Sequence, residues 1–231
     1  MSQFSYSDDG RIVVNTDVIR QPDAALFDPQ TYDVWQAVSR GGRQAAWFIE
    51  ASFGQGVLRH YRRGGLVARL SEDKYVWRGA RATRSFAEFH LLNAMAKEGL
   101  PVPRAWAACY KRHGITYRAA ILVERLLDTQ TLAAKVLRHG KNINSDYVNA
   151  VANAIRQLHD ANVWHADLNA DNILLDKQGK AWLIDFDKAK RTSVLGSQRQ
   201  DNLQRLQRSL RKIAPNAGDH WGVAIAAAYV R

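Results

Sequence analysis

The chain has 231 residues, a formal net charge of +11 and a hydrophobic fraction of 46%. This length allows one two-lobed domain or two small ones, and the apolar fraction is ordinary for a globular protein. A single cysteine, Cys109, excludes an internal disulfide and indicates a reducing compartment. We expect Cys109 to be a small buried side chain, as is usual for a free cysteine. No run reaches the roughly 20 apolar residues that span a bilayer, and the polar, acidic start lacks the pattern of a signal peptide.

The excess of positive charge predicts an anionic partner. Nucleic acid, anionic lipid and phosphorylated substrates all satisfy that requirement. The chain carries no recognisable nucleic-acid-binding motif, so we do not expect a nucleic-acid partner. No feature of the sequence predicts an obligate protein partner.

Alternating and β-branched runs predict a series of strands in the first half of the chain. Gly54 and Gly56 are expected to mark the turn of a hairpin, and residues 32–39 are compatible with either a helix or a strand. The predicted strands lie at residues 11–15, 45–49, 56–61, 104–110 and 116–124.

A helix is predicted from Thr83 to Glu98, because Gly99 and Pro101 follow as stop signals. Its apolar positions fall at helical spacing with Glu88, which places a carboxylate on the buried stripe. A buried charge is costly unless it is paired, so Glu88 is expected to meet a cation such as Arg59.

Helices are predicted in the second half at about 129–138, 145–161, 197–213 and 218–229. Between the second and third of these lies the stretch from His165 to Asn172, followed by two short apolar runs around a turn. The two runs predict a hairpin that returns Asp185 beside Asn172, with Asp167 on the loop just before them.

Two carboxylates and one amide on adjacent loop ends suit an Mg-nucleotide, because Mg²⁺ takes oxygen ligands and usually shares them with phosphates. Asn172 and Asp185 are the candidate metal ligands. Asp167 then remains to accept a proton from an attacking hydroxyl, as phosphoryl transfer requires.

This stretch resembles the catalytic loop and metal-binding motif of the protein-kinase-like superfamily. The pattern H-x-D-x-x-x-x-N matches at His165, Asp167 and Asn172, and Asp185-Phe186 matches the start of D-F-G, with Asp187 in place of the glycine. The resemblance implies an α+β, two-lobed kinase-like fold, with a mostly antiparallel N-lobe sheet and a short, mainly helical C-lobe. We expect a single domain over residues 1–231, divided into lobes of about 1–124 and 125–231.

The same resemblance implies a nucleotide site in the N-lobe. The turn Gly41-Gly42-Arg43 is expected to approach the phosphates, and backbone groups from Glu124 to Leu126 to bind adenine. Arg59 is the candidate for the phosphate-steadying cation in place of the usual lysine, with Arg62 in reserve.

Two basic segments are not needed for phosphoryl transfer itself. One covers residues 62–84 and is expected to form a flap or a solvated loop; the other is the predicted helix at 197–213. We expect their arginines to face an anionic membrane surface, although the apolar side of the helix belongs to the core. In the second segment the residues concerned are Arg199, Arg205, Arg208, Arg211 and Lys212.

Within the superfamily, the chain resembles the 3-deoxy-D-manno-octulosonic acid (Kdo) kinases of lipopolysaccharide inner-core biosynthesis. The segments that carry the resemblance are Gly41-Gly42-Arg43, the run from Leu58 to Gly65, Arg84 to Glu88, Leu100 to Pro103 and the catalytic motifs. The chain after Asp187 is short and has no A-P-E motif, which favours a small-molecule or glycan acceptor over a peptide.

This resemblance implies ATP- and Mg²⁺-dependent phosphorylation of the 4-hydroxyl of a Kdo residue on lipid A precursor (Kdo-lipid IVA). It also implies peripheral attachment to the cytoplasmic face of the inner membrane. A kinase-like enzyme acting on inner-core heptose, an antibiotic or a protein is the alternative, since fold alone does not fix the acceptor.

Overall fold

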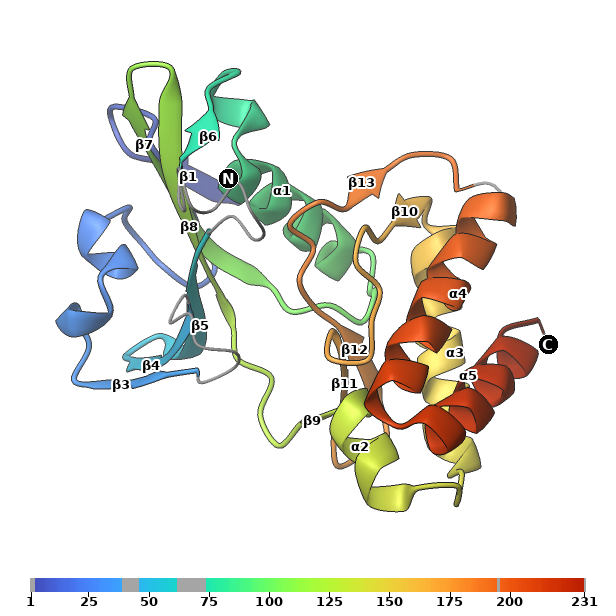
Figure 1. Ribbon diagram of the computed structural model, residues 1–231. Coiled ribbons are helices and arrows are strands. Elements are labelled where there is room, and N and C mark those ends of the chain that lie inside the picture. Colours follow the sequence, from blue (N-terminus) through green and yellow to red (C-terminus); the bar gives the residue numbers. More distant parts are fainter. Residues whose placement is uncertain (1–2, 39–45, 62–73, 195, 231) are drawn as a thin grey trace. The chain divides into compact units, whose positions relative to one another are not determined.

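The computed structural model describes residues 3–38, 46–61, 74–194 and 196–230 (Figure 1). The chain divides into two compact units. The first contains Met1–Asn93 and Arg104–Arg125, and the second contains Ala94–Pro103 and Leu126–Arg231. The sequence-based boundary near residue 124 falls close to one of these junctions, whereas residues 94–103 group with the second unit. The assignment of the whole chain to a single domain stays a prediction.

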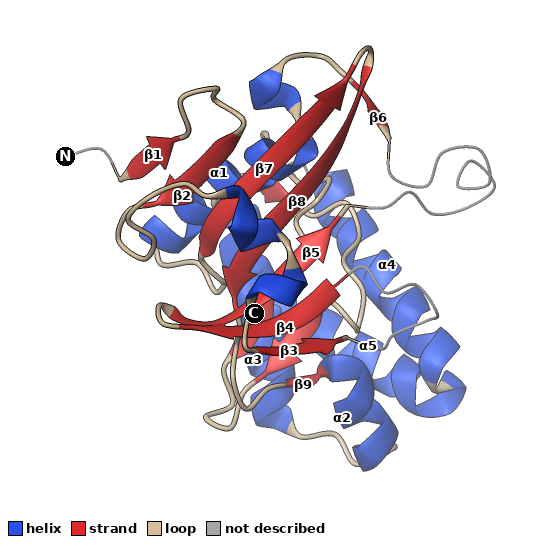
Figure 2. Cartoon of the chain, turned by 90° about the vertical axis from the view of Figure 1, so that its left-hand side faces the viewer, coloured by secondary structure: helices blue, strands red, loops and turns tan. Residues whose placement is uncertain are grey.

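The first unit is built on an eight-stranded antiparallel sheet, which confirms the predicted α+β class. Seven strands follow the order β1-β2-β7-β8-β5-β4-β3, and β6 pairs with β8 (Figure 2). Residues 32–39, for which the sequence left two possibilities, contain a strand. The strands are β1 (Phe4–Tyr6), β2 (Ile12–Asn15), β3 (Val34–Ala37), β4 (Ala46–Ala51), β5 (Gly54–His60), β6 (Tyr75–Val76), β7 (Ala105–His113) and β8 (Thr116–Glu124).

The two glycines of β5 have a different role from the predicted one. Gly54 and Gly56 lie within the strand, and the turn consists of Ser52 and Phe53. A Cβ atom on Gly56 would lie 2.9 Å from Leu122 Cδ1 and 3.0 Å from the Trp106 ring. Close packing across the sheet therefore favours glycine at position 56, and the prediction that Gly56 marks the turn was wrong.

Short 3-10 turns and most of one long helix complete the first unit. Phe27, in η1 (Ala24–Phe27), joins a core that contains Val14, Leu58 and Leu122. Helix α1 (Arg84–Lys97) packs Phe86 edge-on against Tyr110 of β7, with ring centroids 5.2 Å apart. The other 3-10 turns are η2 (Pro29–Thr31) and η4 (Ala80–Ala82).

The second unit is mainly helical. Trp221 is fully buried, and its indole Nε1 donates to the carbonyl of Gly140, 3.0 Å away, which joins the last helix to the end of α2. The helices are α2 (Leu132–His139), α3 (Ser145–Asp160), α4 (Gly196–Ile213) and α5 (Pro215–Val230). The strands are β9 (Gln130–Thr131), β10 (Val163–Trp164), β11 (Ile173–Leu175), β12 (Ala181–Leu183) and β13 (Lys190–Arg191). None of the described helices is both long and apolar enough to cross a membrane.

Helices α4 and α5 approach each other closely through glycine. A Cβ atom on Gly218 would lie 2.0 Å from the carbonyl oxygen of Leu210, so no larger residue fits there. Leu206 and Leu210 of α4 are buried in the core of the unit. This packing holds α4 beside the loop that follows β10.

Candidate active site

The loop after β10 is anchored by buried residues that leave its carboxylate exposed. His165, Leu168 and Ala170 are each fully buried. His165 accepts a hydrogen bond at Nδ1 from the backbone N–H of Asp167, at 3.1 Å, and its Nε2 lies 3.1 Å from the carbonyl of Ile184. These two bonds require a neutral ring with its proton on Nε2. Burial favours the same state, because it lowers the pKa of His165.

The predicted hairpin is present and brings Asn172 and Asp185 to neighbouring positions. Strands β11 and β12 pair in antiparallel register, and the backbone N–H of Ile184 donates to the carbonyl of Asn172 at 3.0 Å. The carboxamide Nδ2 of Asn172 donates to the carbonyl of Asp167 at 2.9 Å. This bond fixes the carboxamide and leaves its oxygen as the atom that can bind a cation.

Asp185 has a backbone conformation that is rare for a residue with a side chain. Its φ angle is 64°, in the left-handed region. The next residue, Phe186, is buried and packs on His165 with a centroid distance of 4.7 Å. Strained backbone of this kind persists where its surroundings hold it, and it gathers at functional sites. Buried Phe186 thus holds Asp185 at the surface.

The donor set fits a magnesium ion that shares its ligands with a nucleotide. Within the described residues there is no group of three or more His, Cys, Asp or Glu side chains that could hold a metal ion. Asn172 and Asp185 offer one amide oxygen and one carboxylate, both hard oxygen donors. Phosphate oxygens would have to supply further ligands, as is usual for Mg²⁺ in enzymes that use nucleotides.

Helix α4 also contacts this loop, a feature that the sequence-based prediction missed. Asn202 is buried, and its Nδ2 donates to the carbonyl of His165 at 2.9 Å. About two turns further along α4, the hydroxyl of Ser209 accepts a hydrogen bond from the backbone N–H of Ala170 at 3.1 Å. Between these two contacts, Arg205 Nη1 lies 3.8 Å from the Asp167 carboxylate. Three contacts on one helix face therefore follow the loop.

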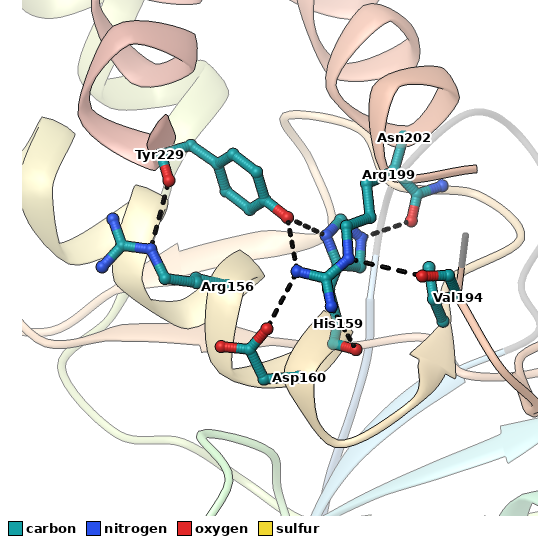
Figure 3. Close-up of polar contacts among 7 residues, drawn as sticks. All are labelled: Arg156, His159, Asp160, Val194, Arg199, Asn202 and Tyr229. Carbon is teal, nitrogen blue, oxygen red and sulfur yellow. Dashed lines mark hydrogen bonds and ion pairs between the residues drawn. The ribbon is translucent and has the colours of Figure 1, made fainter. Parts of the chain in front are cut away.

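Behind Asn202 lies a polar network that reaches the last helix (Figure 3). His159, fully buried in α3, has Nε2 3.1 Å from Asn202 Oδ1 and Nδ1 2.9 Å from the hydroxyl of Tyr229. The amide oxygen only accepts, so the proton of a neutral His159 lies on Nε2 and the Tyr229 hydroxyl donates to Nδ1. Burial lowers the pKa of His159. Arg156 closes the end of α5 by donating to the carbonyls of Ala228 and Tyr229.

Two arginines of the basic helix α4 are paired with acidic residues of the neighbouring helices. Arg199 Nη1 pairs with Asp160 at 2.8 Å and reaches the Tyr229 hydroxyl at 3.3 Å (Figure 3). Arg211 Nη2 pairs with Asp219 at 2.6 Å. Both arginines are therefore paired with neighbouring helices, and the expectation that the basic helix faces an anionic membrane surface stays a prediction.

In the first unit, the predicted partners Arg59 and Glu88 meet. Glu88 is 3% exposed, and Arg59 Nη2 lies 2.5 Å from one of its carboxylate oxygens and 2.6 Å from the other. The hydroxyl of Tyr61 donates to the second oxygen. The guanidinium of Arg59 also lies over the Tyr61 ring, 5.0 Å from its centre. The hydrogen bonds and the cation offset the cost of burying this carboxylate, so Glu88 can remain charged.

The remaining predicted nucleotide residues are placed in part. Gly41, Gly42, Arg43 and the reserve residue Arg62 lie outside the described residues. At the end of β8, the backbone N–H of Glu124 donates to the carbonyl of Arg104 at 2.9 Å. That N–H is thus occupied by the sheet.

The neighbouring backbone groups differ from one another. The N–H of Arg125 donates to the carbonyl of Gln55 at 3.0 Å, and its guanidinium stacks on the Phe48 ring at 3.9 Å. Among the bonds within the described chain, none uses the N–H of Leu126. Of the groups expected to bind adenine, the Leu126 N–H is therefore the one left to donate.

The fold, the Asp167 loop and the Asn172–Asp185 hairpin together define a phosphotransferase of the kinase type. Residues 34–227 match the Lipopolysaccharide kinase (Kdo/WaaP) family, and the chain belongs to that family. The resemblance found in the sequence is confirmed by this match.

Two curated relatives are both named 3-deoxy-D-manno-octulosonic acid kinase. The relative from Xanthomonas oryzae pv. oryzae (strain PXO99A) is 47% identical over 208 residues, which cover 90% of this chain and 82% of the relative. The relative from Stenotrophomonas maltophilia (strain R551-3) is 47% identical over 205 residues, which cover 88% of this chain and 81% of the relative.

Proposed function

We propose that this kinase transfers the γ-phosphoryl group of ATP to the 4-hydroxyl of a Kdo residue on lipid A precursor. The observation that carries the proposal is the 47% identity with named Kdo kinases over most of both chains. An acceptor with a phosphorylated lipid also accounts for a net charge of +11.

Asp167 is the proposed general base. Its side chain is 62% exposed, so an acceptor hydroxyl can reach it. The carboxylate takes the hydroxyl proton while the hydroxyl oxygen bonds to the γ-phosphorus and the bond to the leaving ADP oxygen breaks. The hydrogen bonds of the neutral His165 ring to the Asp167 N–H and the Ile184 carbonyl hold this loop in place.

Arg59 is the proposed phosphate-steadying cation, and Glu88 is the positioning residue that holds it. The Leu126 N–H would bind the adenine edge. Asn172 and Asp185 would hold Mg²⁺, which when bound neutralises phosphate charge and orients the transferred group. Gly41, Gly42 and Arg43 keep their predicted role at the phosphates.

The direct test is turnover by the purified full-length chain with ATP, MgCl₂ and Kdo-lipid IVA. Mass spectrometry should show addition of one phosphate to the acceptor, and NMR should place it on the 4-hydroxyl of Kdo. Parallel reactions with a heptose acceptor, an aminoglycoside and a generic protein substrate cover the alternatives. Phosphorylation of one of these in preference to the Kdo acceptor would overturn the proposal.

We further propose that the kinase works at the cytoplasmic face of the inner membrane through a surface in the first unit. This surface, the β7–β8 tip, carries two exposed aliphatic side chains, Val76 at 60% and Ile115 at 82%. They are adjacent, because Trp77 donates its N–H to the Ile115 carbonyl at 2.9 Å. The exposed cations of the tip are Lys74, Arg78, Arg81, Lys111, Arg112 and Arg118.

The composition of the tip supports contact with anionic lipid. Neither residues 74–83 nor residues 105–123 contain an acidic residue. Exposed aliphatic side chains among cations are the pattern of a surface that inserts shallowly and is attracted to acidic headgroups. Within the segment 62–84, which was expected to bind lipid, residues 74–84 belong to this tip, and residues 62–73 lie outside the described residues.

A further inference from the structure

The five cations of α4 fall into two groups. Arg199 and Arg211 are paired with Asp160 and Asp219, at 2.8 Å and 2.6 Å. Across the described parts of the chain, by contrast, Arg208 and Lys212 form no ion pair, and Arg205 has only its 3.8 Å contact with Asp167. The structure of the unit therefore uses two of the five cations and leaves three to meet a ligand.

Arg205 and Lys212 lie along the helix face that borders the catalytic loop. Arg205 lies between Asn202 and Ser209, which bond to the backbone of His165 and Ala170. Lys212 follows Arg205 by seven residues, or about two turns and 10 Å along the helix, and projects in nearly the same direction. A basic row thus begins beside Asp167 and runs along α4 away from it.

The contact between Arg205 and Asp167 is open enough to admit a ligand. A separation of 3.8 Å is longer than a hydrogen bond, and the two side chains are 45% and 62% exposed. The guanidinium makes no hydrogen bond inside the described chain, so its planar set of donors can turn to an incoming group. This differs from Arg199, whose donors are occupied by Asp160, Tyr229 and the His159 carbonyl.

The acceptor named by the relatives is a sugar acid, which raises an electrostatic difficulty at this site. An anionic sugar that brings its hydroxyl to Asp167 also brings a carboxylate towards a carboxylate, and like charges repel. A cation next to the base removes the repulsion. Arginine is suited to this position because its fork matches a carboxylate with two parallel hydrogen bonds.

We propose that Arg205 binds the carboxylate of the acidic sugar acceptor and thereby orients its hydroxyl towards Asp167. The inference rests on the proposed function, since it concerns the acceptor of the same site. Because Arg205 lies next to Asp167, it can bind an anionic group on the same sugar that carries the reacting hydroxyl. Lys212, about 10 Å further along the helix, lies where a phosphate on the lipid part would be met. The ligand chemistry is the same, a set of anionic oxygens, and the sources are distinguished below.

The test compares three acceptors: the Kdo-lipid, its carboxamide analogue, and the Kdo-lipid with the lipid phosphates removed. For Arg205→Gln, kcat/KM with the acid should fall by about 10- to 100-fold, the range for a hydrogen bond to a charged group. The loss should appear mainly in the KM of the acceptor, with the KM of ATP unchanged. With the carboxamide the variant and the wild type should differ little, and Arg205→Lys should recover part of the loss.

Arg138→Gln is the matched control, because Arg138 of α2 is exposed and has no ion pair in the described chain. It should behave as wild type with all three acceptors. Equal losses for Arg205→Gln on the acid and the carboxamide would overturn the proposal, since they would mean that Arg205 acts on Asp167 or on the nucleotide. A loss that disappears only when the lipid phosphates are removed would assign Arg205 to phosphate and overturn the carboxylate assignment. Wild-type inactivity towards Kdo acceptors would overturn the proposed function as well, and it is measured before any variant.

Discussion

Arg59 Nη2 lies within 2.6 Å of both carboxylate oxygens of Glu88, which is 3% exposed. The two residues come from β5 and α1, and the pair joins the sheet to the helix. The cation is partly solvent-accessible, with 24% of its side chain exposed, whereas the side chain of its partner is 2% exposed. Loss of the cation would leave a buried charge, whereas neutralising the carboxylate would not, so the two substitutions should differ in their effect on stability.

Arg59→Ala should lower both stability and turnover. It removes the cation from a carboxylate whose side chain is 2% exposed, so the free energy of unfolding should fall by up to about 3 kcal/mol. Glu88→Gln keeps the shape without the charge and should cost less stability, but it should still lower kcat by loosening Arg59. Urea unfolding and steady-state kinetics measure both effects. Since the residues act together, the double variant should lose less activity than the two single losses combined; additive losses would refute the shared role.

The second prediction concerns Asp167. The nearest cation in the described chain, Arg205, lies 3.8 Å from its carboxylate, so the substitution breaks no tight ion pair. Asp167→Asn keeps the size of the side chain but cannot accept the proton, so kcat should fall by roughly 10²- to 10⁴-fold. Nucleotide affinity, measured by calorimetry with a non-hydrolysable ATP analogue, should stay within about twofold of wild type. Retained turnover in a correctly folded variant would remove Asp167 from the role of base.

Magnesium dependence should separate Asp185 and Asn172 from the other polar residues of the loop. Asp185→Asn and Asn172→Ala each remove an oxygen donor, so each should need a higher MgCl₂ concentration for half-maximal rate. Asp176 is a useful control because its carboxylate is used inside the hairpin, by Lys180 and Trp182. Asp176→Asn should change stability without shifting the magnesium titration. An unshifted titration for Asp185→Asn would place the metal ligand elsewhere.

The sequence predicted the catalytic hairpin well because its information is local. An apolar run, a turn at Gly179 and a second apolar run fix the register that returns Ile184 to Asn172. The Arg59–Glu88 pair was also predictable, because helical spacing placed a carboxylate on a buried stripe, where it needs a cation.

Contacts between distant helices left no such signal. Asn202 holds the carbonyl of His165 across 37 positions, and an asparagine within a basic helix looks like any surface residue. In the same way, the arginines of α4 could not be sorted, because the partners of Arg199 and Arg211 belong to α3 and α5. The role of Gly56 was misjudged because the tight approach of Trp106 is set by the sheet and not by its own neighbours.

Stability should fall as the pH drops below about 6.5, and the buried histidines set the direction. Burial lowers the pKa of His159, His165 and His90 below the ordinary value of 6.5, so the folded state keeps them neutral. The unfolded chain takes up these protons once the pH passes below 6.5. It then binds more protons than the folded state, and the free energy of unfolding decreases. The neutral histidines therefore make their full contribution to the free energy of unfolding above pH 6.5. This contribution is lost as the pH falls towards the pKa values of the folded state.

Carboxylates with lowered pKa act in a separate, more acidic window. Arg191 lowers the pKa of Glu98 and Arg211 lowers that of Asp219, from ordinary values of 4.5 and 3.8. Their contribution is present above those values and is lost as the pH falls further. Denaturant unfolding between pH 5 and 8 thus isolates the histidines. His159→Gln should flatten the slope between pH 5 and 6.5, and an unchanged slope would exclude His159 as a source of it.

The last prediction concerns the β7–β8 tip, where Val76 and Ile115 are exposed among cations. The wild type should float with vesicles that contain phosphatidylglycerol and remain unbound with pure phosphatidylcholine. Replacing Lys74, Arg78 and Arg81 by glutamine should weaken binding about 100-fold, since each basic residue near an anionic surface contributes about 1 kcal/mol. Ile115→Ser should also weaken it, because insertion of an apolar side chain adds to the attraction.

Leu137→Ser, at a side chain on α2 that is 62% exposed, is the matched control and should bind as wild type. Raising the salt from low to physiological strength shortens the Debye length to about 8 Å and should release the wild type in part. Equal flotation with both lipids, or equal loss for Ile115→Ser and Leu137→Ser, would show that the tip is not the surface that meets the membrane.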